Sequence, residues 1–311
     1  MRALHEVFTT VIAANRQSGR PGLSSGGPEV ARERVRGATA ILGEGPVAVL
    51  VREIEIPTRA GNIGGLLYQP DAPEGQVQAL IVYYHGGGWV AGSLQDFDAF
   101  AKQLAHTTQC GVLSVDYRLA PEYPFPAGLQ DAEDALVWAS ENTATLIGMK
   151  GATIVLVGDS AGGNLAAVVA ISSANKIAVA LQVLFYPVID AGMATPSYRQ
   201  YGEGLLLAAD DMKWFYEQYA PQTLWHEPAI SPLRAVLPGT IPPAWIALAA
   251  YDVLHSEGLD YADHLQQIGK LAGVVTYEDL THGFVRWFNL IDSARAAIDD
   301  AAREIRKAIG R

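Results

Sequence analysis

Short runs of almost wholly apolar residues recur along the chain, separated by segments with helical periodicity. Strands buried on both faces have this composition, because helices cover both faces of a parallel sheet. The runs are Ala79–Tyr84, Val112–Tyr117, Thr153–Val157, Leu181–Tyr186, Ala244–Ala249 and Val274–Tyr277. The helices are expected at residues 95–107, 129–142, 161–174 and 256–269. This order of strands and helices predicts an α/β fold with a mostly parallel sheet.

Three terminal segments add to this pattern. Residues 47–56 and 63–68 partly alternate apolar and polar positions, so we expect two strands near one edge of the sheet. Ile291, Ile298 and Ile305 recur at spacings of seven, which predicts a C-terminal helix that docks on the sheet. A partner-binding helix is the alternative for that segment.

The N-terminal segment predicts a helix and then a loop. Residues 1–20 carry an interrupted apolar pattern, with Leu4, Phe8, Val11 and Ile12 on one helical face. A signal peptide has an unbroken apolar centre and a small-residue cleavage site, and this segment has neither. Residues 18–28, rich in Gly, Ser and Pro, are expected to form a loop.

An insertion interrupts the alternation after the strand at 181–186. Nearly sixty residues separate it from the strand at 244–249, and several of them are aromatic. Insertions after a parallel strand lie at the carboxyl edge of the sheet, where ligands bind. The insertion is therefore expected to form a lid over an apolar substrate, a second small hydrophobic core, or both.

Charge and cysteine content exclude several classes of function. The net charge of −11, without a cluster of Lys or Arg, makes the chain a poor binder of nucleic acids or anionic membranes. No apolar run reaches the length of a membrane span. Cys110 is the single cysteine, so an intramolecular disulfide and multi-thiolate metal sites are excluded. These features fit a protein of the reducing cytoplasm. Neither a metal nor another cofactor is expected.

The strongest chemical signal is a glycine-flanked serine at residues 158–163. The segment Gly-Asp-Ser-Ala-Gly-Gly follows an apolar strand and precedes a helix of small residues, as the G-x-S-x-G nucleophile elbow requires. The turn is so tight that Gly158 and Gly162 must lack a Cβ. Ser160 is therefore the candidate nucleophile. A glycine-rich turn capped by serine is the alternative.

A second glycine-rich loop, His85-Gly86-Gly87-Gly88-Trp89, directly follows the strand at 79–84. Backbone amides freed by the glycines can hold an oxyanion together with the amide of Ala161. A phosphate cradle is disfavoured, because neither G-x-G-x-x-G nor a P-loop lysine is present. His85 is expected to hold this loop by a hydrogen bond rather than to act in catalysis.

A serine nucleophile needs a histidine base and an orienting carboxylate. His282 follows the last predicted strand, and Asp252 follows the strand before it, in the order that α/β-hydrolases use. We therefore expect Asp252 as acid and His282 as base. The competing carboxylates are Glu257, Asp260, Glu278 and Asp279.

Six motifs together resemble the bacterial hormone-sensitive lipase-like esterases (family IV), a branch of the α/β-hydrolase superfamily. They are HGGGW at 85–89, DYRLAPE at 116–122, FPA at 125–127, GDSAGGNLA at 158–166, YDVL at 251–254 and HGF at 282–284. The acid motif departs from the family pattern, because Val253 replaces proline and His255 replaces arginine. Asp116, Arg118 and Glu122 are expected to form a structural ion-pair cluster.

The resemblance implies an α/β-hydrolase fold with an eight-stranded sheet and a helical cap. The cap would comprise residues 1–45 and 190–225, and the catalytic domain residues 46–189 and 226–311. The resemblance implies a carboxylesterase for short- to medium-chain acyl esters, monomeric or homodimeric, in which Ser160, Asp252 and His282 are catalytic. The oxyanion amides expected are those of Gly86, Gly87, Gly88 and Ala161. The substrate-binding residues expected are Trp89, Asp159, Leu206, Phe215 and Phe284.

Two other functions remain alternatives. An amidase, or a hydrolase of another acyl group, would use the same three residues. A ligand-binding receptor of this fold is disfavoured, because such relatives have lost the histidine that this chain retains at His282.

Overall fold

An eight-stranded sheet forms the centre of the computed structural model, which describes residues 2–19, 22–71 and 77–311. Its order is β1-β2-β4-β3-β5-β6-β7-β8. The strands are β1 (Val49–Thr58), β2 (Gly61–Pro70), β3 (Ala79–Tyr84), β4 (Gly111–Val115), β5 (Thr153–Asp159), β6 (Val179–Phe185), β7 (Ala244–Tyr251) and β8 (Leu271–Thr281). The pairs β1–β2 and β2–β4 are antiparallel, and the other pairs are parallel. The predicted mostly parallel sheet is confirmed.

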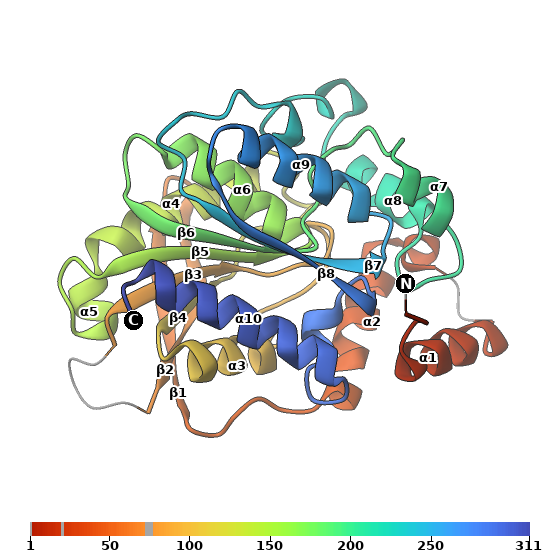
Figure 1. Cartoon of the computed structure of the whole chain (residues 1–311), viewed down its shortest axis with the longest axis horizontal. Helices are drawn as coiled ribbons and strands as arrows, with labels where there is room; N and C mark the ends of the chain where they lie inside the picture. Colours follow the sequence, from red (N-terminus) through yellow and green to blue (C-terminus); the bar gives the residue numbers. More distant parts are fainter. Residues whose placement is uncertain (1, 20–21, 72–76) are drawn as a thin grey trace.

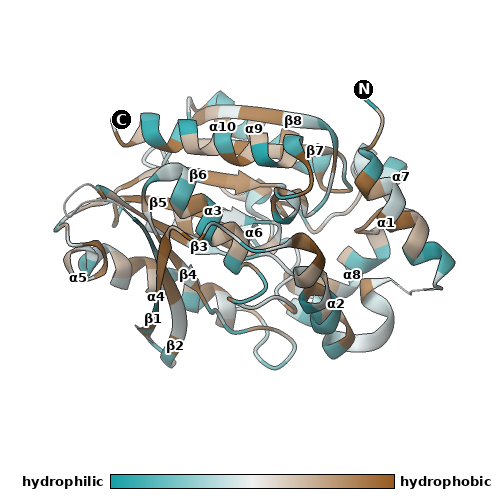
Figure 2. Cartoon of the chain, turned by 90° about the horizontal axis from the view of Figure 1, so that it is seen from below, coloured by the Kyte–Doolittle hydropathy of each residue, from teal (hydrophilic) through white to brown (hydrophobic). Residues whose placement is uncertain are grey.

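Helices cover both faces of the sheet (Figure 1). The helices α3 (Asp98–Thr108) and α10 (Asp292–Ala308) lie on one face. The helices α4 (Ala127–Glu141), α6 (Ala161–Ser173) and α9 (His255–Gln267) lie on the other. Each face has its own buried apolar cluster. Because both faces are covered, the inner strands are almost wholly apolar, as the colouring of β6 in Figure 2 shows.

The C-terminal helix α10 docks on the sheet, as predicted. Ile298 and Ile305 are fully buried, and Figure 2 shows hydrophilic bands along the rest of the helix. Packing against the sheet therefore accounts for the apolar face of α10, and the alternative of a partner-binding helix is not needed.

Among the described residues, six further helices gather at the carboxyl ends of the parallel strands (Figure 1). They come from two distant parts of the chain. The N-terminal part contains α1 (Glu6–Gln17), a short 3-10 helix η1 (Leu23–Gly26) and α2 (Gly27–Leu42). The insertion contains α7 (Pro196–Tyr201), α8 (Ala209–Tyr219) and the 3-10 helix η2 (Gln222–Leu224). Short helices elsewhere are α5 (Thr143–Ile147), η3 (Pro232–Arg234) and η4 (Phe284–Trp287).

The N-terminal predictions hold in part. Phe8 of α1 is buried, in agreement with the predicted apolar face. The loop predicted at 18–28 contains η1 and the start of α2, and its residues 20–21, like residue 1 of the predicted helix, lie outside the described residues.

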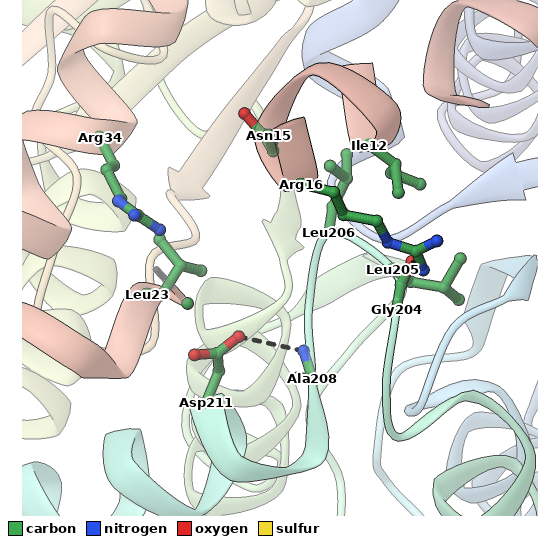
Figure 3. Close-up of a pocket in the computed structure, with 11 residues that line it drawn as sticks. Ile12, Asn15, Arg16, Leu23, Arg34, Gly204, Leu205, Leu206, Ala208 and Asp211 are labelled. Atoms are coloured by element: carbon green, nitrogen blue, oxygen red, sulfur yellow. Dashed lines mark hydrogen bonds between the residues drawn. The ribbon is translucent and has the colours of Figure 1, made fainter. Parts of the chain in front are cut away.

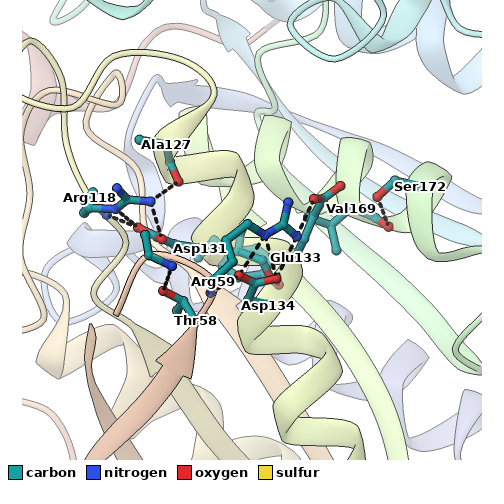
Figure 4. A network of polar contacts seen from close by, with 12 residues as sticks. Thr58, Arg59, Arg118, Ala127, Asp131, Glu133, Asp134, Val169 and Ser172 are labelled. Carbon is teal, nitrogen blue, oxygen red and sulfur yellow. Dashed lines mark hydrogen bonds and ion pairs between the residues drawn. The ribbon is translucent and has the colours of Figure 1, made fainter. Parts of the chain in front are cut away.

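The ion-pair cluster expected at Asp116, Arg118 and Glu122 does not form as one unit. Arg118 instead forms a bidentate pair with the fully buried carboxylate of Asp131 on α4, at 2.8 Å for both contacts (Figure 4). Glu122 pairs with Arg32 of α2, with Arg32 Nη1 2.9 Å from Glu122 Oε1. Both partners lie outside the motif at 116–122, so the motif alone did not reveal them.

Candidate active site

Ser160 lies on the turn between β5 and α6 in a conformation that few residues other than glycine adopt. Its φ is 55° and its ψ is −120°. The surrounding chain holds this strained backbone in place. The Ser160 amide donates to the Phe185 carbonyl at 2.9 Å, and the Ser160 carbonyl accepts from the Val188 amide at 3.2 Å. A strained residue fixed in this way is typical of a functional site.

Two flanking glycines permit the turn. A Cβ on Gly158 would overlap the carbonyl of Gly162, and a Cβ on Gly162 would overlap the carbonyl of Tyr84. The steric requirement expected from the sequence is therefore present in the structure.

Strand pairing brings the other functional segments to Ser160. In the register of β3 and β5, Tyr84 pairs with Gly158, so the glycine loop after β3 lies beside the serine turn. In the register of β7 and β8, Tyr251 pairs with Thr281. The next residues in the chain, Asp252 and His282, therefore leave the sheet together at its carboxyl edge.

Asp252, His282 and Ser160 form a continuous hydrogen-bonded relay. His282 Nε2 lies 2.8 Å from Ser160 Oγ, and His282 Nδ1 lies 2.8 Å from Asp252 Oδ2. The other carboxylate oxygen of Asp252 accepts the Leu254 amide at 3.0 Å. The Asp252 side chain is fully buried, whereas His282 keeps 12% of its side chain exposed. A fixed carboxylate and an accessible imidazole are what serine activation requires.

The competing acids have other surroundings. Glu257 is buried, and its Oε1 accepts the Ile189 amide at 2.7 Å. Asp279 accepts a hydrogen bond from Ser293 at 3.1 Å. Within the described ranges, Asp252 is the one carboxylate found in contact with the imidazole of His282.

The glycine loop differs from the expectation at one residue. The Gly86 amide donates to Asp159 Oδ1 at 2.8 Å, so it is not available to an oxyanion. In the described part of the chain, no protein acceptor is found for the amides of Gly87, Gly88 and Ala161. Gly87 has a φ of 122° and Gly88 a φ of 62°, values that favour glycine. Gly86 is thus corrected from an oxyanion donor to an anchor of the loop.

His85 supports the same loop from below. It is fully buried and stacks between Phe97 and Tyr117, with ring centroids 5.2 and 4.6 Å away. Its Nδ1 lies 2.7 Å from the Gly86 carbonyl. Burial lowers the pKa of His85 to about 4, which favours a neutral ring that donates one hydrogen bond. These contacts support the structural role expected for His85.

Asp159 is a buried carboxylate beside Ser160. Tyr83 donates its hydroxyl to Asp159 Oδ1 at 2.7 Å, in addition to the Gly86 amide. Burial raises the pKa of Asp159 to about 6, and these two hydrogen bonds oppose part of that rise. Asp159 therefore orders the glycine loop but is costly to keep ionised at neutral pH.

A pH dependence of stability follows for Asp159→Asn. The folded-state pKa of about 6 exceeds the ordinary value of 3.8, so folding favours the protonated acid. The stabilisation from this group is present below pH 3.8 and is lost as the pH rises through 6. Relative to the wild type, the variant should therefore gain about 2 kcal/mol in unfolding free energy between pH 4.5 and pH 7.5. Urea unfolding of the wild type and the variant across this pH range measures the change. A difference in unfolding free energy that does not vary with pH would contradict the raised pKa of Asp159.

The cavity above Ser160 is small and mostly apolar, with a volume of about 120 Å³. Its lining includes Ser160, His282, Gly87, Gly88, Asp159, Leu23, Val35, Phe97, Leu207, Met212, Phe215 and Arg286. Asp159 and Phe215 were expected there. We call this space the catalytic cavity.

Three of the expected substrate-binding residues are not found among the described residues that line the catalytic cavity. Trp89 is buried beneath α8, where it stacks on Tyr219 at 4.3 Å. Phe284 is fully buried against Tyr186, at 4.8 Å between ring centroids. Leu206 lines a neighbouring cavity, while Leu207 faces this one. The two aromatic residues next to the glycine and histidine loops, Trp89 and Phe284, are thus core residues.

Several lining residues were not singled out by the sequence. Leu23 and Val35 come from the N-terminal segment, and Arg286 follows the His-Gly-Phe motif. The Arg286 guanidinium donates to the Val35 carbonyl at 3.1 Å and to Thr39 Oγ1 at 3.2 Å, which ties α2 to the histidine loop. The sequence carried no signal for them beyond the apolar character of Leu23 and Val35.

The strained serine after the central strand β5, with the acid after β7 and the histidine after β8, defines the class of α/β-hydrolases with a serine nucleophile. The family described as alpha/beta hydrolase fold matches residues 81–286, and the chain belongs to this family. The resemblance to hormone-sensitive lipase-like esterases is thereby confirmed.

Similar proteins extend this match to most of the chain. Carboxylic ester hydrolase LipN of Mycobacterium tuberculosis is 35% identical, over 99% of this chain and 84% of its own. Ethyl acetate hydrolase of Pseudomonas putida is 34% identical, over 92% of both chains. The solved hyperthermophilic esterase from the archaeon Pyrobaculum calidifontis superposes with a TM-score of 0.92, at 35% identity, over 99% of this chain and all of its own.

Proposed function

We propose that this protein is a carboxylic ester hydrolase for short- to medium-chain acyl esters, with Ser160, His282 and Asp252 as its catalytic groups. The observation that carries the proposal is the pair of 2.8 Å contacts linking Ser160 Oγ, the His282 ring and Asp252. The names of its relatives, which include an ethyl acetate hydrolase and a carboxylic ester hydrolase, support the same substrate class.

The reaction begins with attack of Ser160 Oγ on the ester carbonyl carbon. His282 Nε2 accepts the hydroxyl proton as the bond forms, because it already lies within hydrogen-bond distance of Oγ. The imidazolium that results is stabilised by the buried carboxylate of Asp252 at Nδ1.

The carbonyl oxygen becomes an oxyanion in this step. The amides of Gly87, Gly88 and Ala161 are proposed to bind it, because they flank Ser160 and no acceptor is found for them among the described residues. Asp159 contributes indirectly by holding the Gly86 amide and thus the loop.

Collapse of the intermediate releases the alcohol, which takes the proton from His282 Nε2. Water then attacks the acyl group on Ser160 with His282 as base, and the acid leaves. An amidase would use the same steps with an amine as leaving group. Matched p-nitrophenyl esters and p-nitroanilides distinguish the two activities.

The proposal includes a cap over the site. It comprises residues 1–45 and 190–225, and residues 46–189 and 226–311 form the catalytic domain. Support comes from the cavity wall, because Leu23 and Val35 come from the first segment and Leu207, Met212 and Phe215 from the second. The substrate is then enclosed between these segments and the sheet edge.

The protein is further proposed to act in the cytoplasm as a monomer or homodimer on a small-molecule ester. The single cysteine, Cys110, is buried, so the fold does not depend on an oxidising compartment. Within the described ranges, no helix is both long and apolar enough to cross a membrane. Light scattering during gel filtration measures the oligomeric state.

The catalytic cavity should limit the length of the acyl chain. Each buried methylene contributes about 0.8 kcal/mol, or roughly fourfold in kcat/KM, until the cavity is full. We expect kcat/KM for p-nitrophenyl esters to rise over the first few carbons and then to fall. Comparable efficiency on emulsified long-chain triglyceride and on a butyrate ester would contradict a closed cavity.

Neighbouring leucines provide a matched control for this experiment. Leu207→Trp should fill the catalytic cavity and lower kcat/KM for the longest efficient ester about tenfold relative to acetate. Leu206→Trp, which changes the adjacent cavity, should leave that ratio near its wild-type value.

A further inference from the structure

A second cavity adjoins the catalytic cavity, and we call it the arginine cavity (Figure 3). Its volume is about 240 Å³. Leu23 lines both cavities. Arg34 and Leu206 line the arginine cavity, whereas the next residues in the chain, Val35 and Leu207, line the catalytic cavity. The same three segments of the chain therefore contribute to the lining of both cavities.

Two guanidinium groups face this second space. Arg34 reaches it from α2 and Arg16 from α1, on opposite sides of the cavity (Figure 3). Arg16 Nη2 donates to the Gly204 carbonyl at 3.0 Å. Gly204 has a φ of +83°, and a Cβ there would lie 2.5 Å from the same nitrogen. The glycine thus allows a contact that fixes the Arg16 side chain at the cavity while using one of its five N–H donors.

One acidic side chain, Asp211, also lines the arginine cavity. Its Oδ1 accepts hydrogen bonds from the Ser24 amide at 2.9 Å and the Ser24 hydroxyl at 2.8 Å. Its Oδ2 accepts one from the Ala208 amide at 3.1 Å. These three neutral donors stabilise the carboxylate but leave its charge of −1 unchanged. The two guanidinium groups and this carboxylate give the lining a positive formal charge, in a chain whose net charge is −11.

The adjoining spaces match a substrate with two different ends. The catalytic cavity is walled by apolar side chains such as Leu23, Leu207 and Met212, which suit a hydrocarbon spacer. The arginine cavity offers cationic groups that only donate hydrogen bonds, and guanidinium groups bind carboxylates with good geometry. A neutral ester uses the first cavity alone.

We propose that the arginine cavity binds a carboxylate that the substrate carries at the end remote from the scissile ester. The substrate class is therefore esters with a distal carboxylate, such as monoesters of dicarboxylic acids. The proposal rests on the esterase function proposed above and adds Arg16 and Arg34 as residues that determine specificity.

The test compares each carboxylate ester with its neutral carboxamide of equal length. One series consists of monoethyl esters of dicarboxylic acids of increasing length, and a second of acetate esters of ω-hydroxy acids. In at least one series, kcat/KM should favour the carboxylate about tenfold at low salt, and added NaCl should reduce this ratio. Equal efficiency for carboxylate and carboxamide throughout both series would overturn the proposal.

Variants assign the effect to the arginines. Arg16→Gln and Arg34→Gln should each lower the carboxylate-to-carboxamide ratio by about threefold, and the double variant should bring it near one. The ratio is internally normalised, so a general loss of activity does not imitate the result. Arg36→Gln is the control, because Arg36 lies exposed on the same helix and is not found in the lining of either cavity. A ratio that survives in the double variant would also overturn the proposal.

A binding measurement keeps this test independent of turnover. Calorimetric titration of the Ser160→Ala protein should show about tenfold tighter binding of the carboxylate ester than of its carboxamide. Failure of the proposed esterase function would remove turnover in the wild type but leave this difference. Equal affinities would refute the carboxylate site alone.

Discussion

Replacement of Ser160 by alanine is expected to lower ester hydrolysis by about 10⁴- to 10⁶-fold. The hydroxyl is the proposed attacking group, and its contact with His282 Nε2 at 2.8 Å is the first link of the proton relay. The fold should persist, because alanine lacks only the oxygen and the tight turn is held by backbone hydrogen bonds. Initial rates with p-nitrophenyl butyrate and thermal unfolding curves measure both effects.

The control is Ser172→Ala, an exposed serine on the helix that follows the nucleophile. It should retain full activity, since its hydroxyl bonds only within the helix, to the Val169 carbonyl. If Ser160→Ala kept a tenth of the wild-type rate in a folded protein, another residue would have to be the nucleophile.

Replacement of Asp252 by asparagine should lower kcat by about 10³- to 10⁴-fold with little change in structure. The amide can preserve the contact with the Leu254 amide, now 3.0 Å from Oδ1. It cannot stabilise the imidazolium of His282, and it favours the wrong tautomer of the ring if its NH₂ group faces Nδ1. The effect should therefore be on kcat rather than on KM.

Asp260→Asn is the matched control for the acid, because Asp260 is a nearby exposed carboxylate that competed for the role in the sequence. Its kcat should stay within about twofold of the wild type. A severe loss in this control, together with a mild loss in Asp252→Asn, would reverse the assignment.

The sequence predicted the sheet well where burial alone decides. The apolar run Ala79–Tyr84 coincides with β3, and Ala244–Ala249 lies within β7. Strands covered on both faces must be apolar throughout, so their composition marks their bounds. The candidate triad could also be predicted from the sequence, because Ser160, Asp252 and His282 each follow a strand and thus reach one edge of the sheet.

The residues that line the site were harder to predict from the sequence than the catalytic candidates. Trp89 was expected to contact substrate, yet it stacks on Tyr219, because the aromatic insertion folds over it. Gly86 was expected to bind an oxyanion, but its amide is taken by Asp159. Such outcomes depend on which side chain fills a space that distant segments enclose, and no local pattern encodes this.

Some of the residues that line the cavity come from a different part of the chain than the proposed catalytic residues. All three proposed catalytic residues lie within the matched region 81–286, whereas Leu23 and Val35 lie outside it. Arg16 and Arg34, at the neighbouring cavity, lie outside it as well. We therefore expect exchange of the first forty-odd residues between relatives to alter which esters are admitted, while Ser160, His282 and Asp252 stay in place. Under the proposed function, substrate selectivity could then change between relatives without any change in the three catalytic residues.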